Sequence, residues 1–388
     1  MQDTYKRFVK SWLGATLAAL AGVVAFNLLV DPAGAYPCLH LRSLEPLRYL
    51  SHDRVHKAEM ARRGGWEIII LGSSRSKAGL PAEYPWLATN QTCNLSFDAV
   101  RFPELVMAFD YARQHNRLKH VILCLDFYMF GSGPPWIQDF PESRFNPKVD
   151  LLQYYCKQLL SQASTEDSLN TLRQQRRHFV PARQSLRGFY HHLLSPGMSQ
   201  RQLFDTVLRI TGVGTAKQTV DWSCLDLFRQ VVRTCRDEHI DLQIAIMPVH
   251  ALELECYHNG GRWSDFEKWK AGLVNALAKE GVEGKTGLWD FTGYAGPPAE
   301  SVPPPGDVTT RMKYFFENSH CTPAFGTLML DSMFGAPSSD QCGIKLSRSN
   351  LTAHLHQILE DRAFYARTNA ADIQWVQHLI SEAAAPRK

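Results

Sequence analysis

The clearest pattern along the chain is a set of short apolar runs, each followed by a turn or a polar segment. Residues 66–77, WEIIILGSSRSK, contain the run IIIL, which is typical of a strand buried on both faces. Similar runs predict further strands at residues 93–97, 120–127, 240–248 and 286–291. Apolar residues with helical spacing lie between them, at residues 103–115, 224–239 and 266–279. Strands that alternate with helices favour a parallel, doubly wound sheet, so the expected fold class is α/β.

The longest apolar segment lies at the N-terminus. The basic sequence KRFVK at 6–10 precedes residues 12–30, which carry no charge and are long enough for a membrane-spanning helix of about 20 residues. This order predicts a single-pass anchor in a bacterial inner membrane, with a cytoplasmic N-terminus and a periplasmic body. The alternatives are a signal peptide cleaved near Ala-Gly-Ala at 33–35, for which the apolar run is long, and a buried core helix. An uncleaved anchor is the preferred interpretation.

These patterns divide the chain into an anchor, a linker, a domain and a tail. The segment 130–220 lacks the strand–helix alternation, and its first part is rich in Pro and aromatic residues, as in a lid or a substrate rim. The expected parts are a cytoplasmic tip with the anchor at 1–35, a polar linker at 36–65 ending in a helix at 51–63, an α/β domain at 66–345 with a helical insertion at about 130–220, and a helical tail at 346–388.

Composition indicates a globular protein and excludes several classes of function. The 388 residues are 45% hydrophobic and 21% charged, which allows a large core. The net charge of +4 is small, and no nucleic-acid partner is expected. The chain has no zinc-type CxxC pairs, no P-loop and no GxGxxG, so no metal and no cofactor are assigned.

Nine cysteines give only weak support for an oxidising compartment. Two of them, Cys93 and Cys124, stand in strand-like contexts and are expected to be small buried side chains. Spacing alone does not choose between free thiols and the candidate disulfides, which are Cys224 with Cys235 or Cys321 with Cys342.

The first predicted strand ends in Gly72-Ser73-Ser74-Arg75. Glycine permits a tight turn there, and serine can cap a following helix. Open α/β sheets bind their ligands beyond the carboxyl ends of the strands. Ser74 is therefore a candidate nucleophile, and the alternative is a plain strand–turn–helix junction.

A candidate base for this serine lies near the other end of the chain. The segment YFFENSHCTPAFG at 314–326 contains Glu317 and His320, three residues apart. A carboxylate at this spacing can bond the imidazole Nδ1 and stabilise the imidazolium that forms when Nε2 takes a serine proton. The predicted catalytic group is therefore Ser74, His320 and Glu317, and the alternative for His320 is a surface or capping histidine.

These segments resemble the SGNH (GDSL-like) hydrolase superfamily, in the membrane-anchored branch associated with acylation of cell-envelope polymers. Gly72-Ser73-Ser74 stands where that family has Gly-Asp-Ser, and Ser74 matches the nucleophile. Glu317-x-x-His320 matches the Asp-x-x-His block, with Glu for Asp. The resemblance covers roughly residues 67–330 in patches and implies an SGNH-type three-layer fold.

Two further blocks imply an oxyanion and substrate site. Residues 94–99, NLSFDA, resemble the second block, with Ala99 in place of the glycine whose N–H binds the oxyanion. Residues 123–126, LCLD, resemble the third block, with Asp126 near the usual Asn. An ionised Asp126 would repel an oxyanion, so it is either protonated or paired with Arg75, or the role of the Asn is lost.

His250 is a further candidate on the same side of the sheet. It follows the predicted strand at 240–248, so it is expected at the same edge as Ser74. There it would contact substrate or act as an alternative base.

Two classes of function follow from the resemblance. In the first, the protein transfers an acyl group, expected to be acetyl, to or from a periplasmic polysaccharide, with a multi-pass membrane acyltransferase as its partner. An esterase without that partner is a variant of this class. In the second, the altered blocks mark a non-catalytic SGNH-like scaffold that binds glycan or belongs to an envelope assembly machine.

Overall fold

The computed structural model describes residues 2–36, 44, 52–136, 139–176, 182–185, 187–192, 194, 197–335 and 342–384. At its centre is a six-stranded sheet with the strand order β2-β1-β3-β6-β7-β8. In that order the strands are β2 (Thr92–Asn94), β1 (Ile68–Leu71), β3 (His120–Leu125), β6 (Asp241–Ile246), β7 (Gly287–Asp290) and β8 (Ile344–Lys345). Neighbouring strands are parallel except β7 and β8, so the sheet is mixed and the expectation of an all-parallel sheet is wrong at this edge.

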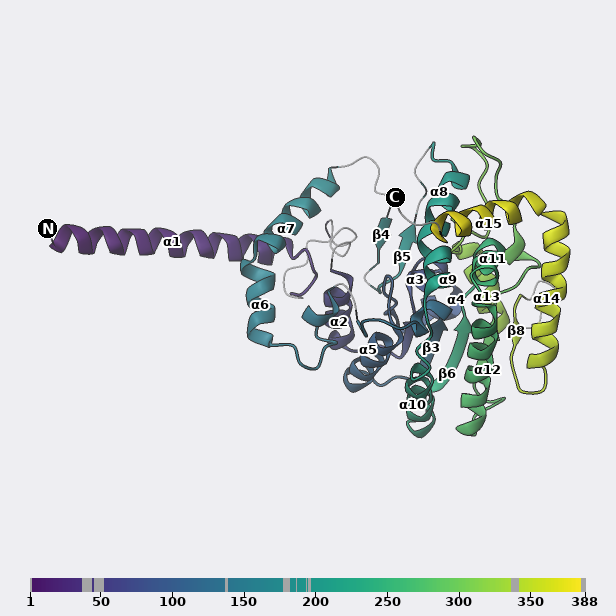
Figure 1. Ribbon diagram of the computed structural model, residues 1–388. Coiled ribbons are helices and arrows are strands. Elements are labelled where there is room, and N and C mark those ends of the chain that lie inside the picture. Colours follow the sequence, from purple (N-terminus) through teal and green to yellow (C-terminus); the bar gives the residue numbers. More distant parts are fainter. Residues whose placement is uncertain are drawn as a thin grey trace.

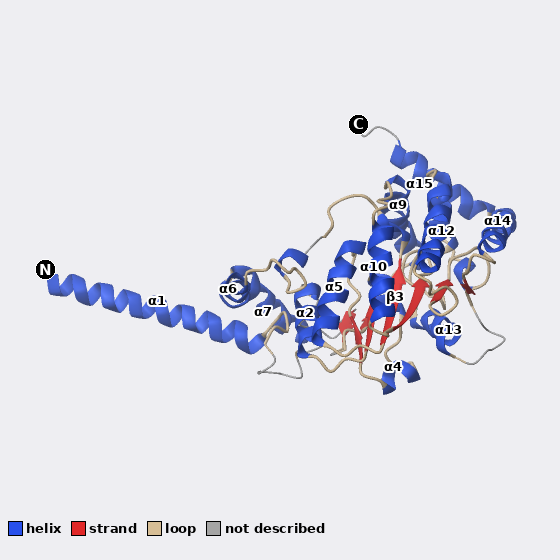
Figure 2. Ribbon diagram, turned by 90° about the horizontal axis from the view of Figure 1, so that it is seen from below, coloured by secondary structure: helices blue, strands red, loops and turns tan. Residues whose placement is uncertain are grey.

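Helices cover both faces of the sheet. Figure 2 shows α5 (Phe102–His115), α10 (Cys224–Asp237) and α12 (Trp263–Lys279) on one side, and α4 (Pro85–Thr89) and α13 (Pro323–Phe334) on the other. From β1 the chain moves one way along the sheet to β2, and then adds β3, β6 and β7 in the other direction. Right-handed crossovers in opposite directions put their helices on opposite faces. The strand order thus reverses between β1 and β3, where open α/β sheets bind ligands.

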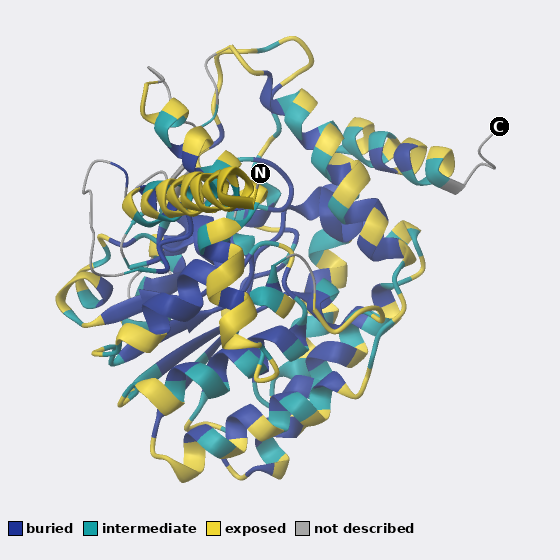
Figure 3. Cartoon of the chain, turned by 90° about the vertical axis from the view of Figure 1, so that its left-hand side faces the viewer, coloured by how far each residue is buried: buried dark blue, intermediate teal, exposed yellow. Residues whose placement is uncertain are grey.

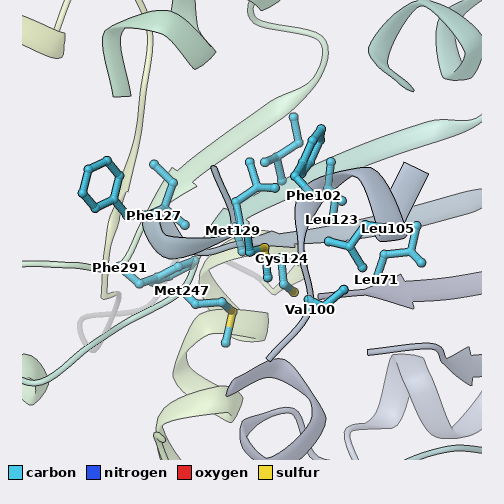
Figure 4. Packing of buried hydrophobic residues seen from close by; sticks show 14 of the residues in the cluster. Leu71, Val100, Phe102, Leu105, Leu123, Cys124, Phe127, Met129, Met247 and Phe291 are labelled. Atoms are coloured by element: carbon cyan, nitrogen blue, oxygen red, sulfur yellow. The ribbon is translucent and has the colours of Figure 1, made fainter. Parts of the chain in front are cut away.

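The strand before Ser74 is buried because its side chains are apolar on both faces. All four residues of β1 are buried, and Leu71 is in register with Leu123 of β3. Figure 4 shows both leucines and Cys124 among the core side chains, close to Phe102 and Leu105 of α5. Cys124 is thus a small buried side chain, as its context predicts.

The cysteines of the described residues are all free thiols, so neither candidate disulfide forms. Cys224 and Cys235 both lie on α10, about 16 Å apart along its axis, which is too far for an S–S bond. Cys321 packs against Gly79 rather than Cys342. Cys38 lies outside the described residues.

The N-terminal helix α1 (Gln2–Val30) extends away from the body and is largely exposed, as Figures 1 and 3 show. It is long and apolar enough to cross a membrane, and only 11% of its apolar stretch is buried. A membrane-anchoring helix is therefore consistent with its length, composition and exposure.

The last turns of α1 are held by two helices of the insertion. The Asn27 side chain donates to Leu159 O and to Thr165 Oγ1, both at 3.0 Å, and accepts from Ser168 Oγ at 2.9 Å. These partners belong to α6 (Leu151–Leu160) and α7 (Gln162–Gln175). The insertion therefore attaches the body to the end of α1.

The helix expected at the end of a linker is instead part of the core. α2 (Asp53–Arg63) has nine consecutive buried residues and packs against α5. Its Arg54 is fully buried and pairs with Glu104 of α5 at 2.9 Å. Charged residues that find partners inside the protein explain why a polar pattern does not give an exposed helix here.

The rest of the insertion and the tail also pack on the body (Figure 1). The short helix η2 (Phe127–Phe130) leads from β3 into the insertion. The remaining elements of the insertion are η3 (Phe140–Glu142), the hairpin of β4 (Ala182–Gln184) and β5 (Tyr190–His192), α8 (Gln200–Val207), the π-helical turn η4 (Leu208–Gly212) and α9 (Val213–Lys217). The elements elsewhere are α3 (Ser74–Gly79), α11 (Ala251–Asn259), η5 (Pro297–Ala299), and the tail helices α14 (Leu351–Thr368) and α15 (Ala370–Ala384).

Candidate active site

Ser74 lies just beyond the carboxyl end of β1, beside the reversal of the strand order. It is the first residue of α3, and the Ser73 side chain caps this helix. Gly72 is needed in the turn, because a Cβ there would lie 2.7 Å from the Cβ of Cys124 on β3. The sequence GSS therefore lets the chain pass close to β3 and begin a helix at Ser74.

His320 reaches Ser74 from the segment between β7 and α13. Its Nε2 lies 2.7 Å from the Ser74 Oγ, and its Nδ1 is hydrogen-bonded to the Glu317 carboxylate. Glu317 also accepts the backbone N–H of Ser319 at 2.6 Å and of His320 at 3.1 Å, which fixes the carboxylate. With Nδ1 donating to Glu317, Nε2 is left to accept the serine proton. The structure thus brings together the three residues of the predicted catalytic group.

Glu317 also sets the protonation of the candidate base. Burial lowers the pKa of His320, but the charge of Glu317 and its hydrogen bond outweigh this, so the pKa is raised above its ordinary value. A nearby carboxylate favours the charged imidazole, which is the form that appears when Ser74 loses its proton. The neutral form that starts the reaction therefore requires a higher pH than an ordinary histidine does.

Glycines allow α13 to approach α3 closely. A Cβ at Gly326 would lie 1.8 Å from the carbonyl oxygen of Gly79, and a Cβ at Gly79 would lie 2.4 Å from Cys321 Sγ. Ser74 begins α3, and His320 stands just before α13. The close packing of these two helices therefore helps to set the distance between the serine and the histidine.

Arg75 joins the serine turn to three neighbouring segments. Its guanidinium donates to Asp126 at 2.7 Å, to Glu253 at 2.6 Å and to Ser319 Oγ at 3.0 Å. Burial lowers the pKa of Arg75, but the two carboxylates outweigh it and hold the pKa well above its usual range. Of the alternatives raised for Asp126, the structure shows the ion pair with Arg75. The side chains of both residues are almost fully buried, so this pair fixes the position of the serine turn from inside the protein.

Ala99 lies on the loop after β2 and lines the same cavity as Ser74. Its φ of 51° is in the left-handed region that favours glycine. Within the described part of the chain, the Ala99 N–H makes no backbone hydrogen bond, and the N–H of Ser74 belongs to the first turn of α3, where helices lack internal acceptors. Both amides are therefore candidates to bind an oxyanion.

Two cavities meet at the Ser74–His320 pair. One, here called the polar cavity, has a volume of about 480 Å³. Besides this pair, its walls include Arg101, Tyr128, Ser132, Thr211, Thr215 and Gln218. The other, here called the apolar cavity, has a volume of about 270 Å³. Its lining is mostly apolar, from Ala78, Tyr190, Leu203 and Val207, and Lys77, Asp98 and Glu317 complete it. The insertion thus supplies walls on both sides of the serine.

His250 does not take part in this site. It is fully buried, its Nε2 is hydrogen-bonded to Glu300 O at 2.7 Å, and its Nδ1 accepts the Leu252 N–H at the start of α11. Burial lowers the pKa of His250 to about 4. Neither cavity is lined by His250, so the structure contradicts its expected role as a substrate contact or base.

Two residues that bind Arg75 beside the catalytic group were not predicted from the sequence. Glu253 stands on the first turn of α11, where an acidic residue is also explained by the helix dipole. Ser319 lies between Glu317 and His320 and carries no signal of its own. A carboxylate near the exit of β6 is the one feature that could have marked Glu253.

Among the described residues, no group of three or more His, Cys, Asp or Glu side chains is placed to hold a metal ion. The fold and the site together define an α/β protein with a Ser–His–Glu arrangement at the reversal of its sheet. A scan against protein-family models and a search of curated proteins each found no match to this chain. The proposals below are therefore based on the geometry of the site and on the motifs of the sequence.

Proposed function

We propose that this protein is a serine-dependent acyl-transfer enzyme in which Ser74 carries the acyl group. The observation that carries the proposal is the 2.7 Å contact between Ser74 Oγ and His320 Nε2, with Glu317 bonded to Nδ1. The same hydrogen-bonded arrangement of a nucleophile, a base and an orienting carboxylate recurs in enzymes of unrelated folds.

The reaction begins when His320 Nε2 removes the Ser74 hydroxyl proton and Oγ attacks the carbonyl carbon of an ester donor. Glu317 stabilises the imidazolium, while the N–H groups of Ser74 and Ala99 bind the oxyanion. The imidazolium then protonates the departing alcohol oxygen as its bond to the acyl carbon breaks. In the second half, His320 takes a proton from the acceptor hydroxyl, whose oxygen attacks the acyl-serine. That proton returns to Ser74 Oγ as the serine ester breaks.

The proposed class is the SGNH superfamily, with a three-layer doubly wound fold. Three features support this proposal: the serine that follows the first strand, the helices on both faces of the sheet, and the Glu-x-x-His segment just before α13. Ala99 and Asp126 depart from the family pattern. The first keeps the backbone donor, and the second is neutralised by Arg75.

The proposed setting is the periplasmic face of a bacterial inner membrane. The substrate class is a cell-envelope polysaccharide, and the partner is a multi-pass membrane acyltransferase that supplies the acyl group; both follow from the family resemblance. The exposed apolar helix α1 supports the anchor. Ala33 and Ala35 are buried, and Arg63 donates to Gly34 O at 2.8 Å, so the candidate cleavage site is folded into the body. This arrangement favours an uncleaved anchor.

A fluorophosphonate probe, which reacts with activated serines, tests the proposal without knowledge of the substrate. We expect the full-length protein to be labelled at Ser74 and the Ser74→Ala variant to be unlabelled. Ser73→Ala is the matched control: it removes a helix cap worth about 1 kcal/mol, but its side chain is not bonded to His320, so labelling persists. The alternative of a non-catalytic scaffold or glycan-binding component predicts that the wild-type protein is not labelled.

A further inference from the structure

The segment from α8 to α9 lines both cavities beside Ser74. Leu203 and Val207 of α8 line the apolar cavity, and Ile210 and Thr211 of η4 line the polar cavity. In an unbroken α-helix, Thr211 would continue the row formed by Leu203 and Val207. The π-helical turn at Leu208–Gly212 adds a residue to the turn, and such turns are frequent at functional sites.

Hydrogen bonds to Asn318 and Glu253 hold Thr211 of η4 in place. The Thr211 hydroxyl accepts from Asn318 Nδ2 at 2.9 Å, and its one proton faces two acceptors, Val207 O at 3.0 Å and Glu253 Oε2 at 3.3 Å. Glu253 is also the carboxylate that binds Arg75. The segment that lines both cavities is therefore held by the same network that positions the serine turn.

The two cavities differ in chemistry. The apolar cavity is lined mainly by methyl, branched aliphatic and aromatic groups of Ala78, Val207, Leu203 and Tyr190. The charged residues in its wall are already paired, Lys77 with Asp98 at 3.0 Å and Glu317 with His320. The polar cavity presents hydroxyl and amide groups together with the guanidinium of Arg101. Apolar surface favours an alkyl chain, and convergent polar groups favour a hydroxylated ligand.

We propose that the apolar cavity binds the acyl chain of the ester donor, that this chain is longer than acetyl, and that the acceptor enters through the polar cavity. This inference rests on the proposed acyl transfer at Ser74. An apolar cavity of about 150 Å³ is large enough for benzene. The volume here is about 270 Å³, so an acetyl methyl would leave most of it unfilled. The cavity can therefore hold a larger acyl group than the acetyl group expected from the family resemblance.

The test compares p-nitrophenyl acetate, butyrate and hexanoate as donors for the full-length protein. Burial of each methylene is expected to raise kcat/KM by about fourfold until the cavity is full. Val207→Trp fills the cavity and should lower the ratio of hexanoate to acetate kcat/KM at least tenfold. Ile210→Trp, three residues away in the polar cavity, is the matched control and should leave this ratio within about twofold.

Fluorophosphonate labelling of each variant shows whether its serine site is intact, and Val207→Phe provides a smaller change if Val207→Trp does not fold. A labelled wild type with no preference for longer chains, or a labelled Val207 variant that keeps the wild-type ratio, would overturn the inference about the acyl chain alone. A wild type without labelling would overturn the acyl transfer itself, and this inference with it.

Discussion

At the residue scale, one carboxylate controls both the orientation and the charge of the candidate base. Glu317 bonds Nδ1 of His320 and is itself held by two backbone N–H groups. It raises the pKa of His320 against the opposing effect of burial. Since the base must be neutral to accept the Ser74 proton, activity should rise as pH increases through this raised pKa.

The Glu317→Gln variant tests both effects at once. We expect kcat to fall by roughly 10² to 10⁴, because a neutral amide stabilises neither the tautomer nor the imidazolium. The pKa of His320 should fall as well, so the acidic limb of the kcat/KM profile moves to lower pH. The measurement is a pH–rate profile of ester hydrolysis for both proteins. An unchanged limb would show that another group titrates.

The sequence was informative for the reacting residues and uninformative for those beneath them. Ser74, Glu317 and His320 stand in short local motifs whose spacing matches a known chemistry. Arg75 finds its partners 51 and 178 residues away, and no local periodicity encodes such contacts. His250 was misassigned for the same reason, because a position at the sheet edge does not say which way a side chain points.

At the scale of elements, the site depends on how closely α13 packs on α3. Gly326→Ala would place a methyl group against the backbone of Gly79, and the helices must separate. Overpacking of this kind costs about 1–3 kcal/mol, and a shift of about 1 Å can cost a factor of about 100 in rate. We therefore expect a lower Tm together with a large fall in kcat.

Gly293→Ala is the control for this change, because a Cβ at Gly293 meets no atom within 4 Å. Thermal melts and esterase assays of the two variants give the comparison. Equal effects of the two substitutions would contradict the role assigned to the contact between the helices.

The junction between α1 and the insertion gives a second prediction at this scale. Asn27→Leu removes hydrogen bonds to α6 and α7 and leaves Ser168 without this partner. We expect hydrogen exchange in both helices to accelerate by roughly tenfold, as a loss of about 1.4 kcal/mol would give. Thr16→Leu is the control, since among the described residues the Thr16 hydroxyl bonds only to Trp12 O, within α1. Unchanged exchange in Asn27→Leu would show that the junction is held by other contacts.

Elements with a strong local pattern were the predictable ones. β1 and β3 contain continuous apolar runs, β6 and β7 are mostly apolar, and all four lie close to their expected positions. β8 is a two-residue edge strand with exposed side chains, and nothing in its composition sets it apart from a loop. α2 was expected to be part of a linker, because the partners that neutralise its charges, such as Glu104, are distant in sequence.

At the scale of the whole molecule, the proposed orientation puts the body outside the cytoplasm. Cys156 on α6 is exposed, whereas the other described cysteines are buried or half-buried. A membrane-impermeant maleimide should therefore label Cys156 once the outer membrane is permeabilised, and Cys156→Ser should lose that labelling. Reaction only after the inner membrane is opened would place the body in the cytoplasm.

The central claim is that Ser74 and His320 act as one catalytic unit, and a double-mutant comparison of kcat tests it most directly. We expect Ser74→Ala and His320→Ala each to lower ester hydrolysis by a similar large factor, on the order of 10³ or more. The double variant should be at most a few-fold slower than either, because members of one catalytic unit are strongly non-additive. Losses that multiply in the double variant, or single variants with wild-type rates, would contradict the claim.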